Sequence, residues 1–372
     1  MSLLKTASIV SVGLLIAAVA MLVSGNIAHA GIVILSFFLS VAIAFQANKA
    51  LKGYTYTIMI FASVTMALYY PQYFVWWGDY KVSGLITPLI QLIMFGMGTS
   101  MSFKDFVGVV KTPKGVFLGV TSHFIIMPMV GFVLAKVSGF PPEIAAGIIL
   151  IGCSPNGMAS NVISYLAKAN LALSITITAV STLLAPFLTP VLMKLLAGTF
   201  IEINVWHMMW DITKMVLMPI GAGLVFNRLF SGKVKWLDKT MPLVSMFGIA
   251  FSIVVIVAAG RDSLLTIGPA LLGLLLLHNL SGYCLGYWSA RLFRMSRRDC
   301  RTIAIEVGMQ NGGLASGIAA QMGKIATVGL APAVFGSMMN VTGSLLASWW
   351  HKRPVEDAEE AVDQPAIRLE NA

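Results

Sequence analysis

One acidic residue of this 372-residue chain lies inside a long apolar segment, and its neighbours are amides and glycines. Glu306 is followed, about one helical turn later, by Gln310 and Asn311 and then by Gly312 and Gly313. A carboxylate and the free backbone carbonyls of an interrupted helix are oxygen ligands that suit a hard cation. The segment therefore predicts a cation site at a helix break.

A second interrupted segment, residues 152–161, repeats this pattern earlier in the chain, and its residues 157–160 align without gaps on residues 313–316. Ser160 and Asn161 follow the break, while Ser174 and Thr178 share one face of the next span because they are four residues apart. These side chains predict further oxygen ligands for a monovalent cation near Glu306. Taken alone, such hydroxyls also fit interhelical hydrogen bonds.

The composition excludes a soluble protein, because 58% of the residues are hydrophobic, only 11% are charged, and the mean hydropathy is +0.85. It predicts a polytopic protein whose surroundings are the lipid bilayer. The net charge of +10 does not indicate a nucleic-acid partner, since the basic residues fall in short loops. Asp211 and Lys214, three residues apart, predict an ion pair that neutralises itself.

Apolar segments of about 20 residues, the length needed to cross a bilayer, recur along the chain. Twelve spans are predicted, near 7–25, 31–46, 54–76, 83–99, 115–138, 142–168 (broken), 170–197, 207–229, 241–260, 264–289, 302–321 (broken) and 330–350. The loops on one side hold 19 of the 25 Lys and Arg residues, those on the other side hold five, and Lys214 lies within a span. Both termini are therefore expected in the cytoplasm, with the protein in the cell inner (plasma) membrane.

Five spans at 54–198 correspond to five spans at 207–350, and the broken span is the fourth in each block. An odd number of crossings makes the second block enter from the opposite face, so the expected fold is all-α with two inverted five-helix repeats. Residues 1–53 form an extra transmembrane hairpin in this scheme. Residues 351–372 form an acidic cytoplasmic tail whose composition predicts disorder.

The N-terminus also fits a second interpretation. Lys5, an apolar run to Val23 and the small residues around His29 are typical of a secretory signal peptide with a cleavage site. Cleavage and retention both place Gly31 outside, so the topology downstream does not depend on the choice.

At this point the sequence resembles the bile acid:sodium symporter family, and it is similar to a bacterial member with an added N-terminal hairpin. The resemblance covers about 54–350 and rests on four motifs: Pro155–Asn161, Leu173–Thr178, Glu306–Asn311 and Asn340–Leu346. It implies a fold in which two broken helices cross at the binding site.

The resemblance also implies ligands. One sodium site would be formed by Ser160, Asn161, Ser174, Thr178 and Glu306, and a second by Glu306, the backbone of Val307 and Met309, the side chain of Gln310 and the position of His123. Substrate contacts would come from Asn311, Gly312, Asn340 and Met158. His123 and Met158 depart from the family pattern, which usually has a glutamine ligand and a hydroxyl residue at these positions.

The implied function is sodium-coupled symport of an organic anion, such as a bile acid or a small carboxylate, by alternating access. Sodium is then the transported coupling ion, and no obligate protein partner is expected. The alternative is proton-coupled or proton-modulated transport through His123 and Glu306, because an imidazole titrates near neutral pH. An enzyme is not expected, since no nucleophile with a base and no paired carboxylates lie at membrane depth.

Overall fold

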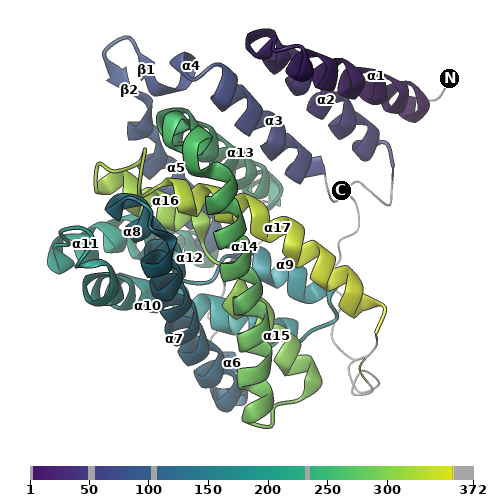
Figure 1. The fold of residues 1–372 in the computed structure, drawn as a ribbon. Coiled ribbons are helices and arrows are strands. Elements are labelled where there is room, and N and C mark those ends of the chain that lie inside the picture. Colours follow the sequence, from purple (N-terminus) through teal and green to yellow (C-terminus); the bar gives the residue numbers. More distant parts are fainter. Residues whose placement is uncertain (1–2, 49–54, 102–106, 231–234, 354, 356–372) are drawn as a thin grey trace.

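The protein is described here from a computed structural model that covers residues 3–48, 55–101, 107–230, 235–353 and 355. Helices dominate these residues, as predicted (Figure 1). In chain order they are α1 (Leu3–Val23), α2 (Ile27–Gln46), α3 (Thr55–Tyr69), α4 (Gln72–Val75), α5 (Ile86–Ser100), α6 (Val107–Lys111), α7 (Pro113–Ser138), α8 (Pro142–Cys153), α9 (Ala159–Leu166), α10 (Leu171–Ala197), α11 (Val205–Ile212), α12 (Met218–Phe230), α13 (Lys235–Ala259), α14 (Arg261–Leu292), α15 (Arg297–Gly308), α16 (Gly312–Gln321) and α17 (Leu330–His351). A small hairpin of β1 (Trp76–Trp77) and β2 (Tyr80–Lys81) precedes a 3-10 turn at Val82–Leu85.

Eight helical segments of the described chain are long and apolar enough to cross a membrane. They lie within 6–23, 29–46, 82–100, 113–138, 171–197, 205–230, 261–292 and 330–351, and shorter apolar helices occupy 57–69, 142–153 and 243–259. The prediction of an all-α polytopic membrane protein is confirmed. Each predicted span falls on one helix or on consecutive helices, and the inverted relation of the two blocks stays a prediction.

The two predicted breaks lie side by side at the centre of the molecule. The chain between α8 and α9 pairs with the chain between α15 and α16 through an antiparallel bridge from Asn156 to Gln310. The backbone N–H of Gly157 also donates to the carbonyl of Met309 at 3.2 Å. Away from water, backbone groups freed by a helix break need such partners. A Cβ at Gly157 would lie 2.7 Å from the carbonyl oxygen of Gln310, so the crossing requires glycine there.

The ends of the broken helices are tied to their neighbours. The guanidinium of Arg301, in α15, is buried and donates to the carbonyls of Ala167, Trp350 and Arg353, at the ends of α9 and α17. At the other end of the broken pair, the Glu143 carboxylate of α8 accepts hydrogen bonds from the Lys324 ammonium and the Thr327 hydroxyl. The Arg301 guanidinium, a cationic donor at the C-terminal ends of α9 and α17, also complements the dipoles of these two helices.

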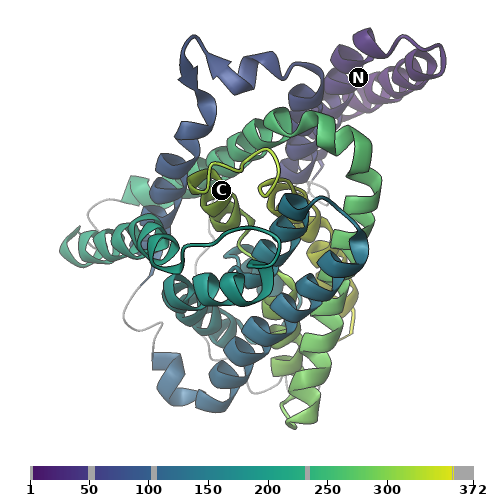
Figure 2. The same cartoon turned by 60° about the vertical axis from the view of Figure 1, so that its left-hand side comes forward.

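Long helices enclose the crossing. α7, α10, α14 and α17 pack against the broken helices (Figure 2). Within this layer, Asn279 of α14 donates its side-chain N–H to the carbonyl of Gly308 at 2.9 Å, at the last residue of α15. His278 of α14 contacts the carbonyl of Met127, in α7, at 3.0 Å. Asn279 therefore provides a donor to a carbonyl at the second break, and His278 joins two of the enclosing helices.

The N-terminal hairpin lies at one edge of the molecule (Figure 1). α1 packs on α2, and α2 packs on α3, where Gly31 touches the ring of Tyr69. Both helices lie away from the crossing, and the choice between a retained hairpin and a signal peptide stays a prediction. Of the predicted tail at 351–372, His351 is the last residue of α17, while residue 354 and residues 356–372 lie outside the described residues.

Candidate functional site

Glu306 lies on α15 just before the second break, and it is fully buried. Its Oε1 is 2.5 Å from the hydroxyl of Ser174, and its Oε2 is 2.8 Å from the hydroxyl of Thr178. Both hydroxyls point toward the carboxylate because residues four apart lie on the same face of α10. The spacing of Ser174 and Thr178 therefore led correctly to two neighbours of Glu306.

α9 adds two further groups to this cluster. Asn161 Oδ1 lies 2.8 Å from Ser174 Oγ and 3.4 Å from Thr178 Oγ1, and Ser160 Oγ lies 3.3 Å from Thr178 Oγ1. We call the side chains of Ser160, Asn161, Ser174, Thr178 and Glu306 the carboxylate cluster. They come from three helices, and the structure brings together all five residues predicted for the first sodium site.

The carboxylate cluster is rich in acceptors and poor in donors. Its three hydroxyl protons face both carboxylate oxygens and the Asn161 carbonyl oxygen, while each hydroxyl oxygen also keeps its own lone pairs. The ion pairs of the described residues all lie elsewhere in the protein. A buried carboxylate without a cationic partner is costly to keep ionised. These oxygen atoms are suitable ligands for a monovalent cation.

His123 of α7 lies against the backbone of the breaks. Its Nε2 is 2.8 Å from the Ser154 carbonyl oxygen, and its Nδ1 is 3.0 Å from Asn156 Nδ2 and 3.3 Å from the Glu306 carbonyl oxygen. A neutral imidazole with its proton on Nε2 satisfies the two shorter contacts, because Nε2–H donates to the Ser154 carbonyl and Nδ1 accepts from the Asn156 amide. In this tautomer Nδ1 has no proton for the Glu306 carbonyl. His123 is therefore next to the main chain of Glu306, and the structure gives it no hydrogen bond to the carboxylate.

The other residues predicted for the second sodium site lie at the end of α15. Gln310 Nε2 donates to the Val307 carbonyl at 2.7 Å, and the Met309 carbonyl accepts from the Gly157 N–H. All three residues are fully buried. A carbonyl oxygen has two lone pairs, so each of these carbonyls can still contact a cation.

The predicted substrate residues lie around the breaks. Asn311 caps α16, and Gly312 packs so closely on α17 that an added Cβ would lie 3.1 Å from Gly336 Cα. Asn340 of α17 donates its amide to the Gly336 carbonyl at 2.9 Å, one turn away. The start of α16 therefore packs on α17 one turn before Asn340. Met158 belongs to the other break, where it is half-buried before α9.

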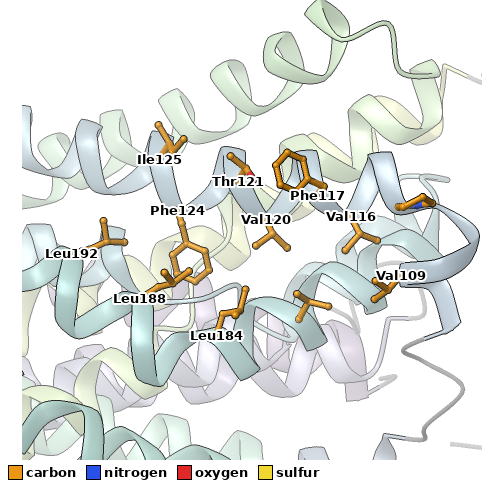
Figure 3. Close-up of a pocket in the computed structure, with 12 residues that line it drawn as sticks. Val109, Val116, Phe117, Val120, Thr121, Phe124, Ile125, Leu184, Leu188 and Leu192 are labelled. Atoms are coloured by element: carbon orange, nitrogen blue, oxygen red, sulfur yellow. The ribbon is translucent and has the colours of Figure 1, made fainter. Parts of the chain in front are cut away.

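An apolar groove of about 630 Å³ between α7 and α10 is separate from this site (Figure 3). It is open to the surroundings, since Phe117 and Ile125 are 73% and 57% exposed. Its lining residues are Val109, Pro113, Val116, Phe117, Val120, Thr121, Phe124, Ile125, Val180, Leu184, Leu188 and Leu192. Exposed apolar side chains on membrane helices match lipid tails in polarity, so the groove is part of the lipid-facing surface.

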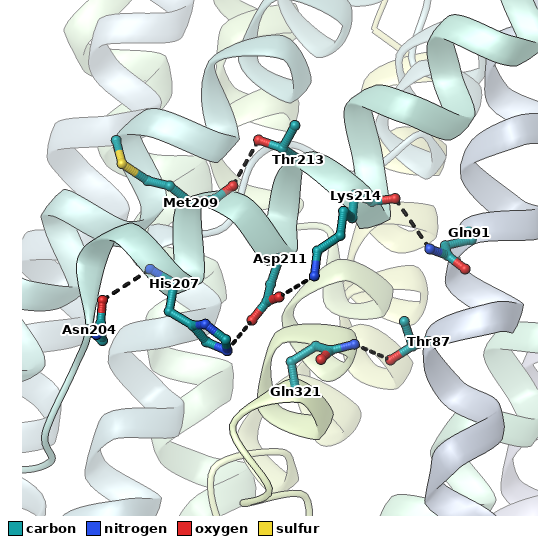
Figure 4. Close-up of polar contacts among 9 residues, drawn as sticks. All are labelled: Thr87, Gln91, Asn204, His207, Met209, Asp211, Thr213, Lys214 and Gln321. Carbon is teal, nitrogen blue, oxygen red and sulfur yellow. Dashed lines mark hydrogen bonds and ion pairs between the residues drawn. The ribbon is translucent and has the colours of Figure 1, made fainter.

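A polar cluster on α11 and the helical turns that follow it forms the predicted ion pair (Figure 4). Asp211 is buried and lies 2.9 Å from Lys214 Nζ and 3.1 Å from His207 Nε2. The chain continues as a π-helical turn at Thr213–Leu217, and the carbonyl of Lys214 accepts from Gln91 of α5 at 3.3 Å. The pair neutralises itself as predicted, and the ion pairs of Asp211 with described residues involve His207 and Lys214, outside the carboxylate cluster.

Comparison with known proteins identifies the family of the chain. The family model described as the Sodium Bile acid symporter family matches residues 87–267. The chain is 39% identical over 302 residues to the uncharacterized sodium-dependent transporter YocS of Bacillus subtilis. These residues make up 81% of this chain and 92% of the relative. The chain belongs to the sodium bile acid symporter family. It is also 32% identical over 271 residues to the probable chloroplastic sodium/metabolite cotransporter BASS1 of Arabidopsis thaliana, 73% of this chain and 68% of the relative.

Family membership makes the protein a membrane-embedded, sodium-coupled transporter and not an enzyme. The matched residues 87–267 include the first break and α10, whereas Glu306 and the second break follow them. The resemblance stated from the motifs is therefore confirmed at the level of the family.

One residue of the site was not predicted. Asn156 is fully buried between His123 and the carbonyl of Glu306, to which its side-chain amide donates. Its only signal in the sequence was its place in the first break, directly before Gly157. An amide at a helix break is easily taken for a turn residue, and its partners come from α7 and α15, which only the fold brings together.

Proposed function

We propose that the protein is a sodium-driven symporter of a small organic anion, and that the carboxylate cluster binds the coupling sodium ion. The observation that carries this proposal is Glu306, a fully buried carboxylate with hydroxyl donors and without a cationic side chain among its described contacts. A sodium ion would supply the missing positive charge. The oxygen-only surroundings suit an alkali or other hard cation.

The proposal assigns the substrate side to the ends of the half-helices. α9 and α16 begin at the crossing, and a helix N-terminus favours a negative group through its free N–H groups and its dipole. Asn311 and Asn340 lie on this side and offer amide groups to a carboxylate or a sulfonate. Met158 adds an apolar wall, which favours an anion with an apolar body.

Coupling in this proposal follows from the shared position of cation and anion. An empty site keeps an uncompensated carboxylate near the crossing, and bound sodium cancels that charge before an anion approaches. The crossing joins two breaks that we propose belong to inverted repeats, 54–198 and 207–350, with both termini in the cytoplasm and the protein in the cell inner (plasma) membrane. Rocking of one group of helices against the other would then expose the site alternately to each side.

We favour sodium over proton coupling on the contacts of His123. Each of its ring nitrogens has a partner that fits the neutral imidazole, the Ser154 carbonyl for Nε2 and the Asn156 amide for Nδ1. Protonation of Nδ1 would give the Glu306 carbonyl a donor at 3.3 Å, but it would also place an N–H against the amide N–H of Asn156 at the shorter distance of 3.0 Å. The local hydrogen bonds therefore work against the charged form.

Uptake by the full chain in proteoliposomes tests the proposal. A panel of labelled organic anions, from small carboxylates to bile acids, should include at least one that accumulates under an inward sodium gradient and not under an equal potassium gradient. The Glu306→Gln variant should lose this accumulation. Sodium-independent uptake of every transported anion, or uptake that follows a proton gradient alone, would contradict the proposal.

A further inference from the structure

Two buried amide oxygens at the crossing have no hydrogen-bond donor. They are Asn156 Oδ1 and Gln310 Oε1, and both residues are fully buried. An unpaired buried oxygen costs about 1–3 kcal/mol, and most buried polar atoms in proteins avoid this cost. Two such oxygens at one place therefore indicate a positively charged or donating group that completes them.

The orientation of both amides is fixed by their nitrogen atoms. Asn156 Nδ2 donates to the carbonyl of Glu306, and Gln310 Nε2 donates to the carbonyl of Val307, at adjacent residues of the last turn of α15. Exchanging N and O in either amide would set two oxygen acceptors against each other. The amide nitrogens are therefore fixed on the α15 carbonyls, and the oxygen of each amide has no donor.

The two oxygens belong to residues that face each other. Asn156 and Gln310 are partners in the antiparallel bridge, and directly opposed residues have Cβ atoms about 5 Å apart on the same face. One ion can therefore touch both amide oxygens. The backbone carbonyls of Glu306 and Val307 are within hydrogen-bond reach of the same two side chains, since each accepts from one of the two amides.

His123 cannot provide this ion with a ligand in the arrangement that the structure shows. The lone pair of Nδ1 accepts from Asn156 Nδ2, and Nε2 faces the Ser154 carbonyl. The imidazole instead holds the Asn156 amide in the orientation that presents Oδ1. His123 is therefore a positioning residue, and the oxygen ligand for the ion comes from the side chain of Asn156.

We propose that Asn156 and Gln310 supply the side-chain oxygens of the second sodium site. The Asn156 oxygen takes the place of the direct ligand that was expected from the position of His123. This site rests on the proposed sodium coupling. It is neutral, and it lies on the backbone side of Glu306, whereas the carboxylate cluster uses the side chain. We call His123, Asn156, Gln310 and the carbonyls of Glu306 and Val307 the crossing cluster.

Binding of radioactive sodium to the purified full chain tests this site without knowledge of the substrate. The parent protein should bind sodium with a Hill coefficient near two. Asn156→Ala should lower the coefficient to near one and weaken the affinity for the second ion at least about tenfold, the effect of losing roughly one charge-assisted interaction. Ser164→Ala is a matched control, because Ser164 Oγ is also buried without a donor but lies on α9 outside the crossing cluster.

A double variant separates a lost ligand from a damaged fold. Asn156→Ala combined with His123→Gln removes one amide oxygen and adds another from α7. Recovery of a coefficient near two in the double variant would support the site, because a general loss of structure would not be repaired by a second substitution.

The outcomes distinguish this inference from the proposed function. Unchanged cooperativity and affinity in Asn156→Ala, with sodium binding lost in Glu306→Gln, would overturn the second site and leave the function intact; a buried water would then satisfy the two oxygens. A parent coefficient near one would also overturn it. A parent protein that binds no sodium would remove the proposed function as well.

Discussion

The carboxylate cluster and the crossing cluster lie on opposite sides of the same residue. The first uses the charged side chain of Glu306 with hydroxyls from α9 and α10, and it has too few protons for its acceptors. The second uses the main chain of Glu306 with two neutral amides, and two of its oxygens have no donor at all. A helix break thus gives one residue two separate ways of binding a cation.

The difference between the clusters suggests how the two ions depend on each other. Only the carboxylate cluster carries formal charge, so its ion should bind first and account for most of the sodium affinity. The crossing cluster depends on the pairing of the two breaks through Asn156 and Gln310. Binding of the second sodium ion should therefore require that the two breaks are correctly paired.

The largest effect is expected from Glu306→Gln. This change removes the only charge of the carboxylate cluster and leaves a neutral amide of the same size, so sodium-driven uptake should be abolished. Because a ligand stabilises the state that it binds, adding 100 Kd of sodium to the parent should contribute about 2.7 kcal/mol and raise Tm, and the variant should show no such shift. A thermal scan in sodium against potassium measures this. A normal sodium shift in the variant would place the coupling site elsewhere.

A smaller effect is expected from Thr178→Val. It removes one hydroxyl that lies 2.8 Å from Glu306 Oε2 and keeps the shape of the side chain. A hydrogen bond or ligand contact to a charged group is worth about 1.5–3 kcal/mol, so the sodium affinity should fall by about tenfold or more. Thr176→Val is the matched control on the same buried helix, since Thr176 bonds the Ala172 carbonyl. Equal losses in both variants would contradict a specific role for Thr178.

Much of the carboxylate cluster could be predicted from the sequence, and little of the crossing cluster could. Glu306 was identifiable as a lone carboxylate at membrane depth, and Ser174 and Thr178 by helical spacing, because local periodicity sets which face they share. The role of Asn156 depends on α7 passing beside the first break and on the register of the bridge to Gln310. Such pairings between segments that are distant in the sequence leave no local pattern.

The fold shows the same division. Apolar length predicted the membrane helices, since hydropathy depends on composition over about 20 residues, and the glycines and amides that interrupt two apolar segments predicted both breaks. It did not predict the hairpin at Trp76–Lys81, the short α6, or the π-helical turn after α11. These features depend on a few local hydrogen bonds, which do not alter the average hydropathy.

A modest effect on sodium affinity is expected from His123→Gln, which changes the crossing cluster and leaves the carboxylate cluster intact. The hydrogen bonds of His123 suit a neutral imidazole. Sodium-driven uptake by the parent should therefore vary by less than about twofold between about pH 6 and 8, the range around the ordinary pKa of an imidazole. The variant should keep sodium coupling, with an affinity within about tenfold of the parent. Initial uptake rates across this pH range measure the effect. A steep rise or fall in the parent that disappears in the variant would favour proton modulation.

The smallest effect is expected from Asp211→Asn, far from both clusters. Asp211 pairs with Lys214 and His207, whose side chains are 43% and 72% exposed, so solvent already screens both partners. The loss of stability should be about 1 kcal/mol or less, and sodium affinity should not change. Thermal unfolding and sodium titration measure both quantities. A large loss of sodium affinity would show that this outlying pair is coupled to the crossing.

The most direct test of the central claim is the number of sodium ions bound per chain at saturation, measured by equilibrium binding of radioactive sodium to the purified parent and to Glu306→Gln. The account predicts two ions per chain in the parent and none at the same concentrations in the variant, because both clusters share this residue and the second ion follows the first. Two ions bound by Glu306→Gln with unchanged affinity would contradict it.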